Sequence, residues 1–217
     1  MGLIAPGDQQ KLRDAFAEMT RPVHLLFFTQ TLGPETCLQT RQILDELPPL
    51  SDRIIVDEVN FVLDTDTVQR YGIDRVPSIA VAFEEDGVLH DSRIRFAGTP
   101  GGYEFVSLVQ AALLAGGREA TLGAESRTLL AALDRPITMR VFTTPTCPHC
   151  PRAVSMAHEM AFLSPHVTAW AVEATEFPDL ARQYQVTGVP KTVVNDDVEI
   201  LGAVPEQEFV ADALRLP

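Results

Sequence analysis

Two cysteines separated by two residues are the part of this sequence best suited to chemistry. Cys147 and Cys150 lie in the run TPTCPHCP, which follows a strand-like segment and opens a helix-like one. A thiol at a helix N-terminus faces unpaired backbone N–H groups and the positive end of the helix dipole. In such CxxC motifs the cysteine pKa falls from about 8.5 into a range of roughly 3.5 to 7.5. We therefore expect Cys147 to be a nucleophile at neutral pH.

Cys150 follows Cys147 by one helical turn, close enough to attack a mixed disulfide and release the partner. The motif thus predicts thiol–disulfide exchange, with the cysteine pair itself as the redox group and no other cofactor. The intervening Pro148 and His149 help to set how strongly the thiolate is favoured over the disulfide. A protonated His149 would stabilise the Cys147 anion. Alternatively, His149 is an exposed loop imidazole, and the sequence leaves both interpretations open.

The same two cysteines could instead form half of a zinc site. Tetrahedral zinc needs four nitrogen or sulfur ligands. The candidates His158 and His166 have a spacing unlike common zinc patterns, and Cys37 is far away in the sequence. We therefore expect no metal.

Glu173 is a candidate proton acceptor for Cys150, because a desolvated carboxylate near a thiol has a raised pKa. It ends the strand-like run VTAWAVE. The alternative, a surface charge at the end of a strand, is the interpretation that the sequence favours.

The chain contains one pattern twice. YGIDRVP at 71–77 is echoed by YQVTGVP at 184–190. In both copies a strand, a helix, a strand and a short helix lead up to the proline, and two strands and a helix follow it. Strands that alternate with helices imply crossover connections and a sheet covered on both faces. The pattern therefore predicts an α/β fold of two tandem thioredoxin-like units, each a central mixed β-sheet flanked by helices.

The expected elements can be placed by their residue ranges. The strands are 23–29, 53–59, 78–83 and 91–98 in the first copy and 137–143, 167–174, 191–194 and 198–204 in the second. The helices are 39–47, 65–72 and 102–116, then 151–163, 177–185 and 205–214, with additional helices at 8–19 and 122–134. The segment GGREATLG reads as a linker, so we expect domains at 1–117, lacking a complete CxxC, and at 118–217, which carries CPHC.

In a thioredoxin-like unit the bond between Val189 and Pro190 is expected to be cis, an isomer of only about 5 to 6% of X–Pro bonds in folded proteins. The bond would present backbone groups of Val189 to an extended partner strand beside the sulfurs. Gly188 leaves room for that approach.

The charge composition of the sequence excludes some classes of binding partner. The sequence has 17 basic and 30 acidic residues and a formal net charge of −13, which repels phosphate backbones and anionic lipid surfaces. No run approaches 18 apolar residues, and the first residues lack the pattern of a secretory signal. Three cysteines are too few and too unevenly spaced for a structural disulfide framework. We expect a cytoplasmic protein that binds neither nucleic acid nor membranes.

The runs TPTCPHCPRAVSMAHEMA and EATEFPDLARQYQVTGVPK, with YGIDRVPSIAV and RFAGTPGGYEF in the first copy, closely resemble the protein disulfide oxidoreductases of thermophilic archaea and bacteria, which are glutaredoxin-like proteins. The resemblance covers nearly the whole chain. It implies two packed thioredoxin-fold units that reduce, form or isomerise protein disulfides in cell redox homeostasis. It also implies that the CPxC of the second unit is the main redox centre, often recharged by a thioredoxin-reductase-like flavoenzyme.

The first unit departs from that family, whose well-known members carry a second CxxC. Pro34 precedes Pro77 by 43 residues and Cys37 precedes it by 40, the same spacings that the two cysteines of the second unit keep to Pro190. Cys37 therefore matches the resolving position, and Pro34 stands where the nucleophile would be. We expect this degenerate site to be redox-silent, with Cys37 a small core hydrophobe and the unit a docking surface.

Two alternatives for the first unit stay open. Cys37 could be the nucleophile of a CLQT motif similar to that of monothiol glutaredoxins, although this alignment needs a longer insertion and loses the matched spacing. Pro77 could keep a cis bond for peptide binding or merely for the fold.

Three functions compete. The leading one is a protein dithiol–disulfide oxidoreductase acting on disulfide-containing proteins, in which Cys147 attacks, Cys150 resolves, and Val189 with Pro190 holds the partner strand. The second is a dedicated electron shuttle to a peroxiredoxin, similar to the paired thioredoxin-fold module at the N-terminus of alkyl hydroperoxide reductase flavoproteins. The third is a non-catalytic scaffold or chaperone, against which the intact CPHC argues.

Overall fold

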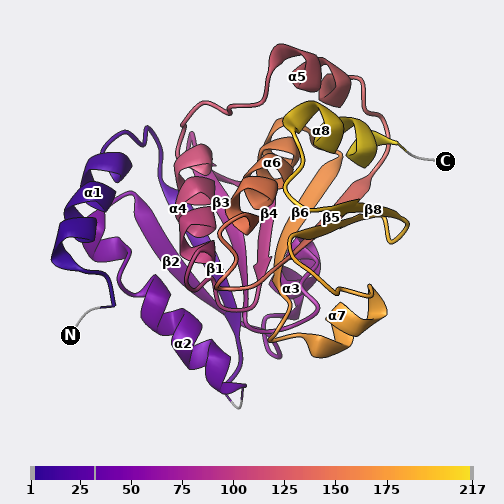
Figure 1. Cartoon of the computed structure of the whole chain (residues 1–217). Coiled ribbons are helices and arrows are strands. Elements are labelled where there is room, and N and C mark those ends of the chain that lie inside the picture. Colours follow the sequence, from indigo (N-terminus) through magenta and orange to yellow (C-terminus); the bar gives the residue numbers. More distant parts are fainter. Residues whose placement is uncertain (1–2, 32, 216–217) are drawn as a thin grey trace.

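All eight expected strands are present and join in one continuous sheet. The computed structural model describes residues 3–31 and 33–215. The strands are β1 (Val23–Thr29), β2 (Ile54–Asn60), β3 (Ser78–Glu85), β4 (Val88–Ala97), β5 (Ile137–Thr143), β6 (Val167–Glu173), β7 (Lys191–Val194) and β8 (Val198–Leu201). Their order in the sheet is β2-β1-β3-β4-β6-β5-β7-β8 (Figure 1).

The expected helices are also present. They are α1 (Pro6–Phe16), α2 (Glu35–Leu44), α3 (Thr65–Tyr71), α4 (Glu104–Ala115), α5 (Ala124–Ala131), α6 (Cys150–Leu163), α7 (Pro178–Gln183) and α8 (Glu206–Leu214), with a 3₁₀ turn at Pro48–Leu50. Among the described residues, no helix combines the length and the hydropathy that a membrane crossing requires.

Each half of the chain contributes four neighbouring strands with one pattern. In both halves the first two strands pair in parallel and the last two pair antiparallel. The halves meet where β4 pairs with β6 in parallel, Ile94 facing Ala169 and Ala97 facing Val172. This arrangement confirms the predicted class of tandem thioredoxin-like units. The boundary near Gly117 falls between α4 and α5 and stays a prediction, since the sheet runs through both halves.

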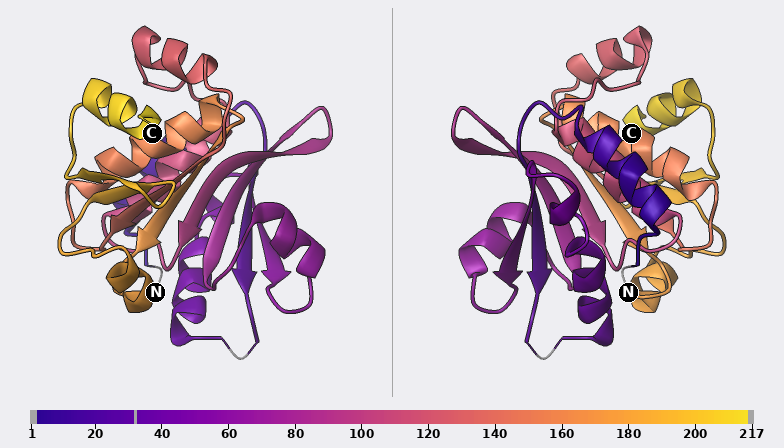
Figure 2. Two further views of the ribbon diagram at one scale, coloured as in Figure 1. Left: turned by 90° about the vertical axis from the view of Figure 1, so that its right-hand side faces the viewer. Right: turned by 90° about the vertical axis from the view of Figure 1, so that its left-hand side faces the viewer.

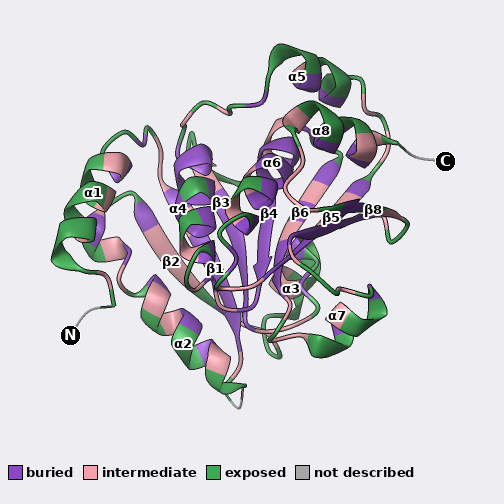
Figure 3. Cartoon of the chain, viewed as in Figure 1, coloured by how far each residue is buried: buried purple, intermediate pink, exposed green. Residues whose placement is uncertain are grey.

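The sheet is covered on both faces (Figure 2). Along β1, Leu25 and Phe27 belong to a large core that continues under α4 and α6, whereas Leu26 and Phe28 belong to a smaller cluster under α3. A third cluster lies under α7. Strands buried on both faces read as continuous apolar runs, which explains the composition of VHLLFFT. Figure 3 shows this burial, which is concentrated in the central strands and in α4 and α6.

The β3–β4 hairpin is longer than the sequence pattern predicted. The turn residues Asp86 and Gly87 both have positive φ, 52° and 75°, as a two-residue type I′ turn requires. This tight turn lets β3 continue to Glu85 and β4 begin at Val88. The strands therefore extend beyond the apolar segments that identified them.

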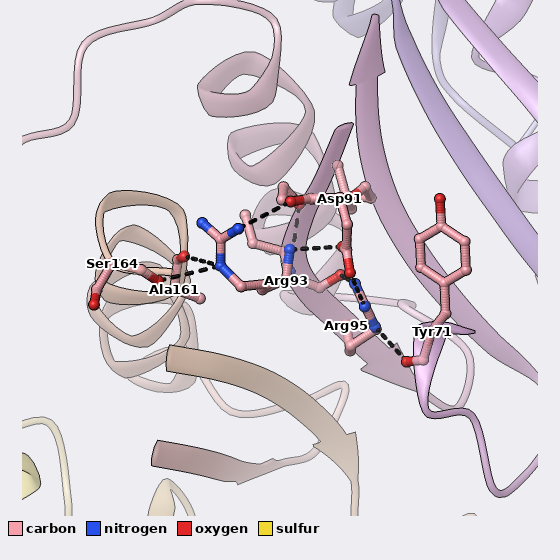
Figure 4. A network of polar contacts seen from close by, with 9 residues as sticks. Tyr71, Asp91, Arg93, Arg95, Ala161 and Ser164 are labelled. Carbon is pink, nitrogen blue, oxygen red and sulfur yellow. Dashed lines mark hydrogen bonds and ion pairs between the residues drawn. The ribbon is translucent and has the colours of Figure 1, made fainter. Parts of the chain in front are cut away.

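A bulge in β4 fastens the first half to the second (Figure 4). Arg93 has a positive φ of 62°, and its guanidinium donates hydrogen bonds to the carbonyls of Ala161, Phe162 and Ser164 at 3.0 to 3.2 Å. These carbonyls lie at the end of α6, where helix acceptors otherwise lack partners. Burial lowers the pKa of Arg93. The contact ties β4 to the helix that begins at the cysteine pair.

Candidate active site

The two cysteines of the CxxC form a disulfide in the loop that joins β5 to α6. Their Cα atoms are 5.5 Å apart. Cys147 is 7% exposed and Cys150 is fully buried. The backbone N–H of Cys150 donates to Cys147 Sγ at 3.1 Å. The outer sulfur therefore lies at the start of α6, as expected, and the inner sulfur is shielded from solvent.

The residues between the cysteines face solvent. Pro148 and His149 are exposed, and His149 occupies the position before α6 without a side-chain capping bond. An exposed loop imidazole is one of the two interpretations left open above. The roles of both residues in setting the redox equilibrium stay predictions.

Both proline motifs have the expected geometry. The bonds Val189–Pro190 and Val76–Pro77 are cis. The carbonyl of Pro190 accepts a hydrogen bond from Gly202 N–H at 2.8 Å, and that of Pro77 accepts one from Gly98 N–H at 2.9 Å. The two halves thus repeat the same loop. Whether Val189 and Pro190 hold a partner strand stays a prediction.

The first unit has the corresponding loop and helix start, but its described residues form no disulfide there. Pro34 is the residue immediately before α2. Cys37 lies inside α2 as a free, buried thiol, with its Sγ 3.0 Å from the position that a Cβ on Gly33 would take. Cys37 lies within its helix, as Cys150 lies within α6, whereas Cys147 precedes α6; this placement supports the alignment of Cys37 with the resolving position.

Glu173 is not the surface charge that the sequence favoured. Its side chain is only 4% exposed. The carboxylate accepts hydrogen bonds from Thr175 N–H and Oγ1 and from Glu176 N–H. These donors occupy the carboxyl oxygens, so Glu173 is a poor acceptor for a thiol proton.

Glu104 is the buried carboxyl that the sequence reasoning missed. It is the first residue of α4 and 2% exposed, and neither carboxyl oxygen has a hydrogen-bond partner among the described residues. Burial raises the pKa of Glu104 to about 7; the neighbouring Ser107 hydroxyl opposes this rise and the charge of Glu173 adds to it. The available signal was an acidic residue opening the otherwise apolar segment FVSLVQAALLA.

The topology places Glu104 beside the cysteine loop. Helices α4 and α6 follow strands that run in the same direction, so both begin at the same edge of the sheet, and they lie side by side (Figure 1). Tyr103 N–H donates to the Pro145 carbonyl at 2.9 Å. Gly102, with a φ of +58°, lies so close that a Cβ there would approach the same oxygen to 2.2 Å. The first half thus contributes a carboxyl and a loop to the cysteine site.

The two histidines weighed as zinc ligands do not join the cysteines in a metal site among the described residues. His158 is buried against Phe96, with ring centroids 5.0 Å apart. Burial lowers its pKa to about 3, although a hydrogen bond to the Arg95 backbone acts in the opposite direction. His166 is exposed. Within residues 3–31 and 33–215, no group of three or more His, Cys, Asp or Glu side chains could hold a metal ion.

Sequence comparisons match the second half most specifically. Residues 137–215 match the thioredoxin domain family. A thioredoxin of Methanocaldococcus jannaschii is 36% identical over 80 residues, which is 36% of this chain and 93% of that protein. The alkyl hydroperoxide reductase AhpF of Xanthomonas campestris pv. phaseoli is 29% identical over 194 residues, 89% of this chain. The chain spans only 33% of that protein's length.

Structural comparisons cover both halves. The NTD_N/C domain of the alkylhydroperoxide reductase AhpF of Enterococcus faecalis superimposes with a TM-score of 0.88 at 27% identity, over 96% of this chain and 98% of that one. A protein disulfide oxidoreductase of Aeropyrum pernix gives a TM-score of 0.85 at 28% identity, over 95% and 90%. These matches confirm the resemblance and the tandem thioredoxin-like fold inferred from the sequence.

Proposed function

Because this chain belongs to the thioredoxin family, we propose that it is a protein dithiol–disulfide oxidoreductase working through Cys147 and Cys150. The observation that carries the proposal is the asymmetry of the pair. Cys147 keeps 7% exposure at a helix start, whereas Cys150 behind it has none. Exchange requires one attacking sulfur accessible to a partner and one protected until the mixed disulfide has formed.

In the reducing direction, Cys147 thiolate attacks one sulfur of a partner disulfide. A Cys147–partner bond forms, the partner's S–S bond breaks, and its second sulfur leaves as a thiolate. The first N–H groups of α6 stabilise the Cys147 anion before the attack, since backbone donors and the helix dipole favour negative charge.

The second step needs a proton acceptor. Cys150 loses its thiol proton and attacks Cys147 Sγ, which closes the intramolecular disulfide and releases the partner's first sulfur as a thiolate. We assign the acceptor role to Glu104 rather than Glu173. Neither carboxyl oxygen of Glu104 has a hydrogen-bond partner among the described residues, and its pKa of about 7 suits proton transfer at neutral pH.

The relatives support a proposal for the partners. The AhpF proteins and the enzymes named NADH dehydrogenase among the matches are 25 to 32% identical to this chain over the aligned segments. We place a thioredoxin-reductase-like flavoenzyme upstream as electron donor and disulfide-containing proteins downstream. The cysteine pair is the redox group, with no further cofactor, and the location is the cytoplasm, where thiol pools are reducing.

The test is reduction of insulin disulfides by the full chain with a chemical reductant in excess. Cys147→Ser is expected to abolish turnover and Cys37→Ser to leave it near wild type, whereas Cys150→Ser, reduced and then freed of reductant, is expected to accumulate a mixed disulfide with insulin. Full activity of the Cys147 variant would contradict the assignment, whereas absence of turnover in the wild-type chain would favour the non-catalytic scaffold.

A dedicated shuttle to a peroxiredoxin is the second candidate. It is favoured by the match to the AhpF domain over nearly the whole of both chains. Turnover on an oxidised peroxiredoxin that exceeds turnover on insulin by two orders of magnitude would select the shuttle. Comparable rates would select the general oxidoreductase.

A further inference from the structure

Unpartnered polar atoms gather between α4 and α6. Seven buried side-chain atoms have no hydrogen-bond partner among the described residues, and four of them belong to Glu104, Ser107 and His158. Each such atom costs about 1 to 3 kcal/mol when it stays unsatisfied. The concentration of these unsatisfied atoms on one pair of helices, α4 and α6, therefore needs an explanation.

These atoms form a row that begins beside the cysteine loop. Glu104 and Ser107 are one turn apart and lie on the same face of α4, close enough for the hydroxyl to lower the pKa of Glu104 against the effect of burial. Further along, Ser107 lines a small cavity of about 30 Å³ together with Ser155 and His158 of α6. Small residues at the helix contact, such as Ala111, line the same cavity.

The cavity has the size and the chemistry of a water site. A volume above about 10 to 15 Å³ accommodates a water molecule if polar partners are present. His158 is uncharged, because burial lowers its pKa, and its ring donates to the Arg95 carbonyl. The unpartnered Nε2 is then an acceptor, and the Ser107 hydroxyl can both donate and accept.

The opposite end of the cavity reaches the surface. Its lining includes Gln110, Glu119 and Arg118, which are exposed or half-buried. The charged groups around the row are few. Glu173 faces Glu104, and Glu159 of α6 is held by Thr121 and the N–H of Leu122. The row therefore leads from a buried carboxyl to solvent, and among the described residues the ion pair that involves a lining residue joins Arg118 to Glu18 at the exposed end.

We propose that this cavity holds water and is the exit route for the proton that Glu104 takes from Cys150, with Ser107 as the relay and His158 as the anchor of the water. The inference rests on the proposed function. The proton passes from the Glu104 carboxylic acid to the Ser107 oxygen while the hydroxyl proton of Ser107 passes to the water. The water chain releases one proton to solvent, and no electrons move.

The matched pair Ser107→Val and Ser107→Thr tests the relay, because valine and threonine have the same shape and differ in the hydroxyl. The fully reduced full chain is mixed with a chromogenic aryl disulfide. The first release of aryl thiolate reports attack by Cys147, and the second reports deprotonation of Cys150 and ring closure. The first phase should be equal in both variants, and the second about tenfold slower in Ser107→Val.

The possible outcomes distinguish failure of the proton relay from failure of the oxidoreductase function. Equal second phases in the two variants would overturn the relay while leaving the oxidoreductase intact. Absence of the first phase in the wild-type chain would overturn the function itself. Magnetisation transfer between water and the His158 ring in the wild-type protein provides a check that needs no variant; failure to observe it would also overturn the proposal.

Discussion

Replacing Glu104 with glutamine tests the buried carboxyl most directly. The amide has nearly the same shape but does not ionise. In the wild-type chain the pKa of Glu104 is raised from 4.5 to about 7, chiefly by burial. At 1.36 kcal/mol per pH unit, this difference corresponds to about 3 kcal/mol of unfolding free energy.

The sign follows from proton binding. Between pH 4.5 and about 7, the folded chain holds a proton on Glu104 that the unfolded chain has released. Stability therefore falls as the pH rises through this window, and the loss is complete above it. Glu104→Gln lacks this decline. The variant should match wild type near pH 4 and exceed its unfolding free energy by about 3 kcal/mol near pH 9.

The assay is urea unfolding of the oxidised full chain at a series of pH values, so that neither Cys147 nor Cys150 titrates. Glu208→Gln is the matched control, because Glu208 is exposed on α8 and its replacement removes the same formal charge. The control should follow the wild-type curve within about 0.5 kcal/mol. Parallel pH curves for Glu104→Gln and wild type would refute the assignment of Glu104 as the buried acid.

Three further outcomes are expected. Gly102→Ala should lower the unfolding free energy by about 2 kcal/mol or more, because the φ of Gly102 is positive and a Cβ there would approach a backbone oxygen to 2.2 Å. The control is Gly101→Ala, since a Cβ at Gly101 would meet nothing within 4 Å. It should change the unfolding free energy by less than about 0.5 kcal/mol in the same denaturation assay. Arg93→Ala should cost about 2 kcal/mol through its lost bonds to α6, whereas exposed Arg152→Ala should be nearly neutral. Iodoacetamide should alkylate Cys147 of the reduced chain about tenfold faster than Cys37 or Cys150, because the start of α6 favours its thiolate, as mass spectrometry of timed samples can measure.

Local hydrophobic patterns predicted the limits of individual strands well where most of the strand is buried and therefore mainly apolar. β1 and β5 have the limits that their apolar runs indicated. The ends of β3 and β4 were less predictable, because beyond Phe83 they leave the core and only the turn at Asp86 and Gly87 defines them. The pairing of β4 with β6 was not predictable from patterning, since alternation within one copy does not specify which strand edges meet.

The site residues show the same contrast between what local sequence patterns indicate and what only the tertiary fold determines. The CxxC and the two prolines are contiguous motifs, and the repeat exposed them. Glu104 and Glu173 are far apart in sequence, and their surroundings depend on the tertiary fold. Glu173 obtains hydrogen bonds from Thr175 and Glu176 within its own turn, whereas Glu104 obtains none from the described residues. Burial raises the pKa of Glu104 to about 7, which the sequence pattern around it does not indicate.

The two halves contribute different parts of the site, so the first half has a role although it lacks a CxxC. The cysteines and their helix belong to the second half, but Glu104 and the Gly102 loop beside Pro145 belong to the first. The parallel pairing of β4 with β6 and the contact of Arg93 with α6 hold these parts in register. Pro34, which stands where the sequence alignment predicts a nucleophile, takes no part in these contributions. In the proposed mechanism the degenerate unit supplies proton chemistry to the redox centre, whereas the sequence alone predicted only a docking surface.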